Sequence, residues 1–205
     1  MVSAVDALER LREGNRRFAS NINRGGDRID ARPAEVADGQ EPFAIILGCS
    51  DSRVPAEIVF DQGLGDLFVI RVAGNIVAPS QIGSVEFAAT KFATRLVVVL
   101  GHSHCGAIEE TLKQLQESSE NRSRNLKSIV DFVRPSVEPL LAQGLGGDPD
   151  VVIEQAVREN IKASAEHMRH GSVILEDLER DEGLVIVGAE YSLETGLVDF
   201  FDGVP

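Results

Sequence analysis

One short polar motif combines three side chains that could do chemistry together. Cys49, Asp51 and Arg53 lie directly behind the apolar run 43–48. A run of that length and composition is typical of a buried strand. A thiol, a carboxylate and a guanidinium are therefore expected to emerge together where a strand ends.

A second motif offers a histidine and another cysteine in the same kind of position. The apolar run 96–100 is followed by His102 and Cys105, around the expected start of a helix. Zinc accepts thiolate and imidazole, and a catalytic zinc site keeps a fourth position exchangeable beside three protein ligands. The helix N-terminus would also favour the thiolate form of Cys105. We therefore predict that Cys49, His102 and Cys105 bind Zn2+.

Two other interpretations of the cysteines stay open at this point. Free cysteines are often merely buried apolar residues, and a disulfide between two cysteines is possible in principle. Both cysteines lie in the two motifs, so none remains for a structural disulfide framework. Their neighbours favour metal binding, and a reducing cytoplasm, where disulfides are rare, fits best.

Asp51 and Arg53 have a chemical role beside such a metal ion. A zinc ion with two thiolate ligands carries little net positive charge, so its bound water is hard to ionise without help nearby. The carboxylate of Asp51 could accept a hydrogen bond from that water or hydroxide, and Arg53 could hold Asp51 ionised through a bidentate pair. Two alternatives remain: a solvated turn pair, or Asp51 as a fourth zinc ligand that closes the site.

The elements that must position these residues alternate along the chain. Apolar β runs separated by helical stretches predict an α/β fold, with a central, mainly parallel sheet flanked by helices. Ligands of such sheets gather at the carboxyl ends of strands, so the first and third strands must be neighbours if the zinc ligands are to meet. The expected strands are 43–48, 67–72, 96–100, 184–188 and 197–201, and the expected helices are 3–20, 33–37, 55–60, 79–93, 105–116, 129–141, 151–170 and 172–179.

Length and composition indicate one domain over residues 1–205. Apolar residues make up 43% of the chain and charged residues 26%, as in ordinary globular proteins. The formal charge of −13 disfavours nucleic acid and anionic membrane surfaces as partners. No apolar run approaches the roughly 18 residues that a membrane span needs. The charged, helical N-terminus does not resemble a signal peptide.

The N-terminal helix is expected to lie apart from the core. A polar, glycine-rich connection at 21–33 separates residues 1–20 from the first strand, and residues 117–127 are expected to form a polar surface loop. We predict that the detached helix packs on a partner subunit in a homodimer or higher homo-oligomer.

From about Gln40 to Phe201 the sequence resembles the β-class carbonic anhydrases. The most specific motifs are Cys-Ser-Asp-Ser-Arg-Val at 49–54, Arg-Val-Ala-Gly-Asn at 71–75 and Gly-His-Ser-His-Cys-Gly at 101–106. The resemblance implies zinc bound by both cysteines and His102, a catalytic pair of Asp51 and Arg53, and reversible hydration of carbon dioxide to bicarbonate and a proton with zinc hydroxide as nucleophile. It also implies active sites at subunit interfaces.

Four further positions take roles from the same resemblance. Gln40 falls where one branch has a substrate-binding glutamine, and Phe68 matches an aromatic of the apolar carbon dioxide pocket. Phe87 stands where that branch often has tyrosine, and Gly106 matches a glycine whose backbone N–H reaches the substrate. Without the resemblance, plain core packing would be the preferred role of both phenylalanines.

One departure from the family concerns regulation. The branch with an inhibitory bicarbonate pocket has tryptophan where this chain has Ile46, although Arg71 and Tyr191 match other residues of that pocket. We therefore expect no bicarbonate inhibition of that type, while Asp51 could still move onto the zinc at low pH. His104 is expected to point away from the metal, and His167 and His170 to lie on the surface.

Two rival functions remain at this stage. Carbon disulfide or carbonyl sulfide could replace carbon dioxide, because enzymes for those substrates look nearly identical at the zinc. A non-catalytic zinc or redox-sensing module, with Asp51 as a permanent zinc ligand, is the rival from another class. The presence of Asp51 and Arg53, together with Gln40 and Gly106, favours the enzyme.

Overall fold

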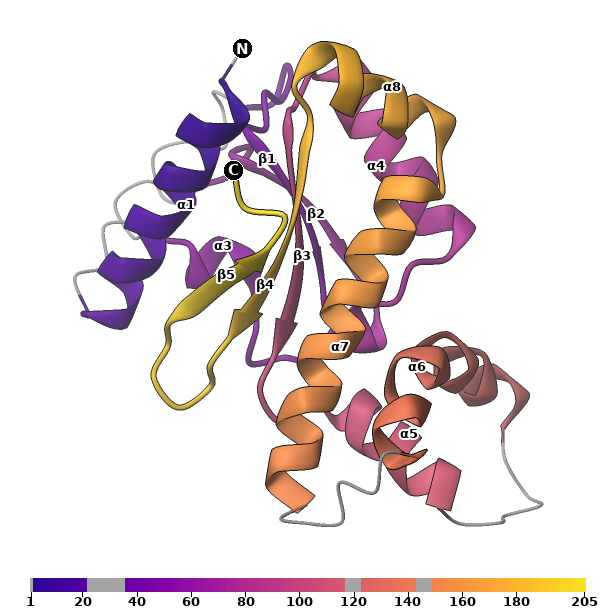
Figure 1. Cartoon of the computed structure of the whole chain (residues 1–205). Helices are drawn as coiled ribbons and strands as arrows, with labels where there is room; N and C mark the ends of the chain where they lie inside the picture. The colour runs from indigo at the N-terminus through magenta and orange to yellow at the C-terminus, as the bar shows by residue number, and fades with distance from the viewer. Residues whose placement is uncertain (1, 22–35, 117–122, 143–148) are drawn as a thin grey trace.

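A five-stranded sheet with helices on both faces forms the centre of the computed structural model, which describes residues 2–21, 36–116, 123–142 and 149–205 (Figure 1). The strand order is β2-β1-β3-β4-β5. The first four strands in the chain are parallel and β5 runs antiparallel to β4, which confirms the predicted α/β fold. The strands are β1 (Ala44–Gly48), β2 (Leu67–Arg71), β3 (Leu96–His102), β4 (Val185–Tyr191) and β5 (Val198–Asp202).

The first and third strands of the chain are direct neighbours in the sheet. β1 pairs with β2 on one side and with β3 on the other, so the order of connection reverses at β1. In the register of the β1–β3 pair, Gly48 lies opposite Leu100. The residues that follow both strands therefore emerge at the same edge of the sheet, as the zinc prediction requires.

The central strands are buried on both faces, which explains their continuous apolar runs. In β3, Val97 and Val99 pack into one core cluster, while Val98 and Leu100 pack into a second cluster on the other face. All four are fully buried. Burying each such side chain stabilises the fold by about 1.5–3 kcal/mol.

The helices between the strands lie close to their predicted ranges, and the largest difference is at one start. The sequence predicts a polar loop over 117–127, but residues 124–127 already belong to the exposed first turns of a helix, in which Lys127 pairs with Asp131 one turn later. The remainder of that loop, 117–122, lies outside the described residues. The helices after β1 are α3 (Ala56–Val59), α4 (Pro79–Lys91), α5 (Gly106–Gln116), α6 (Arg124–Ala142), α7 (Pro149–His170) and α8 (Val173–Glu182).

The fourth strand is longer than predicted. It runs past Gly188 to Tyr191 and includes Glu190, a polar residue that interrupts the apolar run. Glu190 is tolerated in the strand because Arg158 of α7 donates a hydrogen bond to its carboxylate at 3.0 Å. Such a partner is invisible in the local sequence.

The N-terminal helix α1 (Ala4–Ala19) corrects one prediction, because it packs on the sheet of its own chain. Leu8 and Leu11 are buried in the same cluster as Ile46 of β1. Asn15 donates hydrogen bonds to the carbonyls of Val59 and Gly196. The helix is therefore part of the core, although a further contact with a partner subunit stays a prediction. The expected connection from residue 22 onward, and residues 33–35 of the short helix expected over 33–37, lie outside the described residues. Residues 36 and 37 are described and form a bend and a turn, so the predicted helix does not extend over them.

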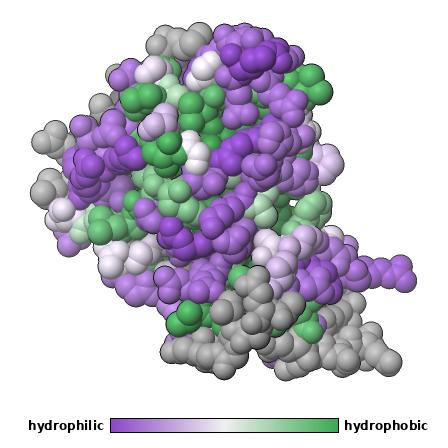
Figure 2. All heavy atoms as spheres, in the orientation of Figure 1, coloured by the Kyte–Doolittle hydropathy of each residue, from purple (hydrophilic) through white to green (hydrophobic). Residues whose placement is uncertain are grey.

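The surface is consistent with the composition. Figure 2 shows hydrophilic residues over most of one face, with smaller hydrophobic patches between them. Among the helices of the described ranges, none is long and apolar enough to cross a membrane.

Helix α7 approaches the sheet closely because two strand positions lack a side chain. A Cβ atom at Gly101 of β3 would lie 2.5 Å from Ile161 of α7, and one at Gly188 of β4 would lie 2.9 Å from the same side chain. Ile161 is fully buried over these two glycines. The pair of glycines therefore sets the height of α7 above the sheet.

We expect Gly188→Ala to lower the free energy of unfolding by about 1–3 kcal/mol, because the added methyl group overpacks Ile161 and Asp202. Gly83→Ala is the matched control, since Gly83 is exposed in α4 and a Cβ there meets nothing within 4 Å. That control should raise stability by about 0.5–1 kcal/mol. Urea unfolding of both variants measures the difference, and equal effects would contradict close packing of α7.

Candidate metal centre

Three potential metal ligands meet at the carboxyl edge of the sheet. Cys49 directly follows β1, His102 is the last residue of β3, and Cys105 directly precedes α5. Their ligand atoms all lie within 4.8 Å of one another, and the two Sγ atoms are 4.0 Å apart. All three residues are buried, with exposed fractions of 5%, 0% and 1%. The structure thus brings together the set that the sequence predicted.

The donor set fits zinc in both chemistry and geometry. Zn–S bonds of about 2.3 Å in a tetrahedral arrangement place two sulfur atoms about 3.8 Å apart, close to the separation seen here. His102 Nδ1 lies 2.8 Å from the carbonyl oxygen of Ser103, so a proton on Nδ1 leaves the lone pair of Nε2 free for a metal. Nε2 is buried and has no hydrogen-bond partner within the described part of the chain.

The two thiols also interact with each other and with the surrounding backbone. Hydrogen bonds from the Cys105 thiol and the Gly74 N–H, together with the neighbouring His102 ring, favour the thiolate of Cys49 and lower its pKa, although burial acts in the opposite direction. The hydrogen bond with Cys49, together with burial, raises the pKa of Cys105. A thiolate is therefore already favoured at Cys49, which is the form that binds a metal.

Arg71 holds the loop that carries Cys49. Its guanidinium donates hydrogen bonds to the carbonyl oxygens of Cys49 at 3.0 Å and Asp51 at 2.6 Å. The sequence pointed to Arg71 as part of a family motif and as a match to a regulatory pocket, but did not predict this contact with the metal loop. Ile46 and Tyr191, the two other positions compared with the family's bicarbonate pocket, are buried in the core cluster on the α1 face of the sheet.

Asp51 and Arg53 form the bidentate pair that the sequence predicted. Arg53 donates from Nε and Nη2 to the two carboxylate oxygens at 2.9 and 2.8 Å, and its backbone N–H donates to Oδ1 at 2.9 Å. These hydrogen bonds hold the pKa of Asp51 well below its usual range. Asp51 Oδ2 lies 3.9 Å from His102 Nε2, so the ionised carboxylate borders the metal ligands.

The residues expected to bind substrate do not all reach this site within one chain. Gly106 lies at the site because it directly follows the metal ligand Cys105. A Cβ atom at Gly106 would meet nothing within 4 Å, so the space beside it is open. Phe68 pairs in register with Ile45, four residues before Cys49, which places it about 13 Å away along the strand.

Gln40 and Phe87 also lie away from the metal ligands in the folded chain. Gln40 is exposed in the segment before β1. Phe87, on α4, is 52% exposed and packs against Phe68 and Phe92 with ring centroids 6.2 and 5.7 Å apart. A side chain that is half exposed is not a core residue. The role of plain core packing therefore does not describe Phe87.

The remaining histidines take no part in the ligand set. His104 Nε2 lies 2.7 Å from a carboxylate oxygen of Glu194, on the β4–β5 hairpin, so its side chain points away from the cysteines. His167 and His170 are exposed near the end of α7, as expected.

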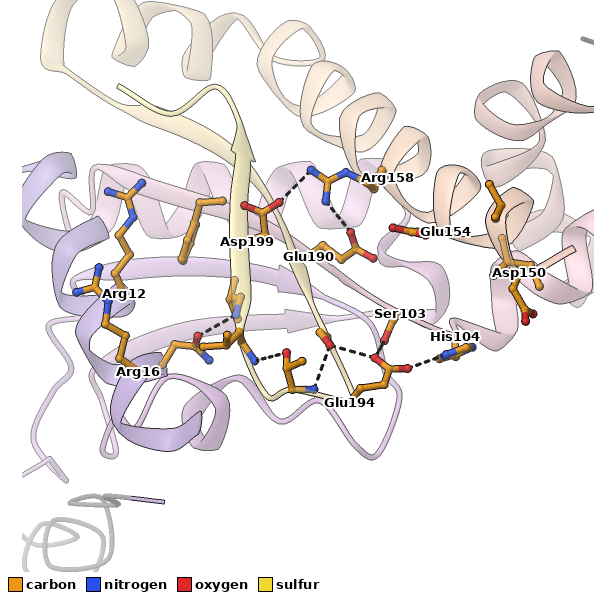
Figure 3. Close-up of a pocket in the computed structure, with 18 residues that line it drawn as sticks. Arg12, Arg16, Ser103, His104, Asp150, Glu154, Arg158, Glu190, Glu194 and Asp199 are labelled. Carbon is orange, nitrogen blue, oxygen red and sulfur yellow. Dashed lines mark hydrogen bonds and ion pairs between the residues drawn. The ribbon is translucent and has the colours of Figure 1, made fainter. Parts of the chain in front are cut away.

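A cavity of about 860 Å3 adjoins the metal loop on the side of this hairpin. Ser103 and His104 lie on its wall beside Glu194, while Arg158 pairs with Glu190 and Asp199 at another part of the wall (Figure 3). The cavity includes none of the three metal ligands. Some of its charged groups pair with one another, as Arg158 does with Glu190 and Asp199, while the metal-binding chemistry belongs to the buried ligand set.

Taken together, the ligands define a class of protein: an α/β metalloprotein with a Cys2His zinc site at the carboxyl end of a parallel sheet. Comparison with known proteins extends this result. The sequence model of the family described as carbonic anhydrase matches residues 44–198. Carbonic anhydrase 2 of Mycobacterium tuberculosis is 39% identical over 193 residues, covering 94% of this chain and 90% of that protein.

Solved structures agree with the sequence comparison. The β-carbonic anhydrase CcaA superposes with a TM-score of 0.73 at 28% identity, covering 96% of this chain and 95% of that one. A β-carbonic anhydrase of Coccomyxa superposes with a TM-score of 0.75 at 25% identity, covering 92% and 83%. The chain belongs to the β-class carbonic anhydrase family. Cys49, His102 and Cys105 are its zinc ligands.

We expect removal of zinc by a chelator to lower the melting temperature by about 10 °C. A ligand present at a thousand times its Kd stabilises the folded state by about 4 kcal/mol, and about 2–4 °C corresponds to each kcal/mol in a chain of this length. Differential scanning calorimetry before and after zinc is restored measures the change. Cys105→Ser is the control, because its melting temperature should no longer respond to zinc. An unchanged wild-type melting temperature would contradict the assigned site.

Proposed function

We propose that this carbonic anhydrase hydrates carbon dioxide to bicarbonate and a proton, and catalyses the reverse reaction, with Asp51 and Arg53 as its catalytic pair. The observation that carries the proposal is the position of their bidentate ion pair, with Asp51 Oδ2 3.9 Å from His102 Nε2. The resemblance to the family supports the same assignment.

The chemistry divides between the metal and the protein. Zinc, when bound, lowers the pKa of a water molecule in its fourth position and so supplies a nucleophile near neutral pH. Asp51 stays ionised because Arg53 lowers its pKa. An ionised carboxylate can only accept hydrogen bonds. Asp51 is therefore proposed to accept a hydrogen bond from the O–H of the nucleophile, which would orient the nucleophile. Gly106, beside open space at the start of α5, is proposed to donate its backbone N–H to the substrate.

The same ion pair argues against a non-catalytic zinc module. In that alternative the carboxylate of Asp51 would be a permanent zinc ligand. Here both carboxylate oxygens accept hydrogen bonds from Arg53, and the backbone N–H of Arg53 adds a third. An oxygen engaged in this way is a poor metal ligand, which favours an exchangeable fourth position. Among the residues that the structure describes, no feature favours carbon disulfide or carbonyl sulfide over carbon dioxide.

We also propose that the protein acts as a homodimer or larger homo-oligomer in which one subunit completes the site of another. Gln40, Phe68 and Phe87 resemble substrate-binding residues, yet Phe68 lies at the opposite end of its strand from Arg71 and its neighbour Cys49. The exposed ring of Phe87 and the exposed position of Gln40 leave both available to a partner. One solved relative is described as tetrameric.

The cytoplasm is the proposed location. Both cysteines are used at the zinc site, and both must stay reduced to bind metal. A reducing compartment maintains that state.

We expect zinc-loaded protein to catalyse carbon dioxide hydration at a rate that rises from about pH 6.5 to about pH 9, because zinc-bound water ionises near or above neutrality. Asp51→Ala should lower kcat by about a hundredfold while zinc content is unchanged. Stopped-flow measurement with a pH indicator, together with metal analysis, tests both expectations.

The matched control is Asp181→Ala. Asp181 forms the same kind of bidentate pair with Arg180, but both are exposed on α8. Its removal should leave kcat unchanged. Zinc loss from Asp51→Ala would support the non-catalytic module, and an inactive zinc-loaded wild type would contradict the proposed reaction.

Shared active sites predict recovery of activity in mixed oligomers. Asp51→Ala and Gln40→Ala subunits should each assemble into weakly active proteins. A dimer with one subunit of each kind, isolated by two different affinity tags, contains one site in which both residues are intact. Because the two sites of a symmetric dimer are equivalent, about half of the wild-type activity should return. Activity no higher than that of either parent would show that Gln40 does not act across the interface.

A further inference from the structure

The sulfur atom of Cys49 receives a hydrogen bond from a turn with unusual backbone geometry. The N–H of Gly74 lies within a buried turn after β2, and its nitrogen is 3.4 Å from Cys49 Sγ. Gly74 has φ 70° and ψ 19°, and the next residue, Asn75, has φ 42°. Two successive left-handed residues, one of them not glycine, are an unfavourable conformation that the surrounding structure must hold in place.

A side chain from a distant helix donates a hydrogen bond to this turn. Asn160 of α7 is 2% exposed and donates a hydrogen bond from Nδ2 to the carbonyl oxygen of Gly74 at 2.9 Å. Its Oδ1 lies 3.4 Å from the hydroxyl of Ser136 on α6, whose single proton is donated to the carbonyl of Val133 at 2.6 Å. The amide of Asn160 is therefore oriented mainly by its hydrogen bond to the turn.

The position of Asn160 is set by the close packing of α7 on the sheet. The next residue, Ile161, fills the space above Gly101 and Gly188. A shift of α7 away from the sheet would move the amide of Asn160 away from Gly74. The packing of the helix is thus connected to the metal ligand by two hydrogen bonds in series, from Asn160 to Gly74 and from Gly74 to Cys49.

We propose that Asn160 is a positioning residue of the zinc centre, which acts through Gly74 on the thiolate of Cys49. By fixing the carbonyl of Gly74, it holds the left-handed turn in the orientation that aims the Gly74 N–H at the sulfur. A hydrogen bond to a metal-bound thiolate withdraws electron density from the sulfur and weakens its donation to the metal. Since two thiolates leave zinc with little net charge, this hydrogen bond favours ionisation of water in the fourth position.

The inference rests on zinc binding by Cys49, and its effect on turnover rests on the proposed function. Three readouts test it in the full-length protein: the thiolate-to-cobalt charge-transfer band of the Co2+-substituted form, the rate of zinc transfer to a chromogenic chelator, and the pH profile of kcat/KM. Asn160→Leu keeps the branched shape of the side chain and removes the amide, and Asn160→Ala is a second variant should the larger leucine prevent folding.

We expect either variant to shift the charge-transfer band to longer wavelength, because a thiolate without its hydrogen bond is a stronger donor. Zinc transfer to the chelator should nevertheless become about tenfold faster, because the turn that positions Cys49 is no longer held in place. The inflection of the pH profile should move to higher pH. Ser164→Ala is the matched control, since Ser164 is also buried on α7, one turn further along. The control should leave the band and the transfer rate as in the wild type.

A fall in melting temperature with the band and the transfer rate unchanged would overturn the inference, since Asn160 would then only stabilise the fold. Equal changes in Ser164→Ala would also overturn it, because they would reflect general loosening of α7. A shifted band and faster zinc transfer in a protein that does not hydrate carbon dioxide would support the positioning role and contradict the proposed reaction instead.

Discussion

Parallel pairing of β1 with β3 is the constraint on which the zinc site depends. The register that sets Gly48 opposite Leu100 brings the residues after both strands to one edge of the sheet. Cys49 then meets His102 and Cys105, although more than fifty residues of chain separate them. This edge is also where the order of strand connection reverses, the position at which open α/β sheets bind ligands. A change of strand order would separate the ligands while leaving every local motif intact.

Hydrogen bonds to the backbone then orient the groups that the sheet brings together. Arg71 holds the carbonyls of Cys49 and Asp51. Arg53 holds both the side chain of Asp51 and, at 3.3 Å, the carbonyl of His104 in the second motif. The two strand-end loops are therefore joined to each other. Charged residues that seemed to belong only to the chemistry also build the loops that carry it.

One chain contains all the zinc ligands but only part of the proposed substrate pocket. Phe68 and Phe87 lie in an aromatic group towards the other end of β2, in which each ring contacts the other and also Phe92. Their partial exposure and their distance from Cys49 follow from the direction of β2, which begins where β1 begins. This arrangement is consistent with the proposal that the active form contains more than one chain.

The sequence by itself determined what short motifs and local composition reveal. It identified the zinc ligands from their motifs and the Asp51–Arg53 pair from its spacing of two residues. It also identified the strands whose apolar runs indicate burial on both faces. It could not show that α1 joins the core, because the amphipathic pattern of a helix does not name the surface it packs on. It ended β4 early because Glu190 is polar, and Arg158 lies 32 residues away. The contact of Asn160 with Gly74 spans 86 residues. Only the tertiary structure decided such contacts, because they exist only once α7 has packed against the sheet.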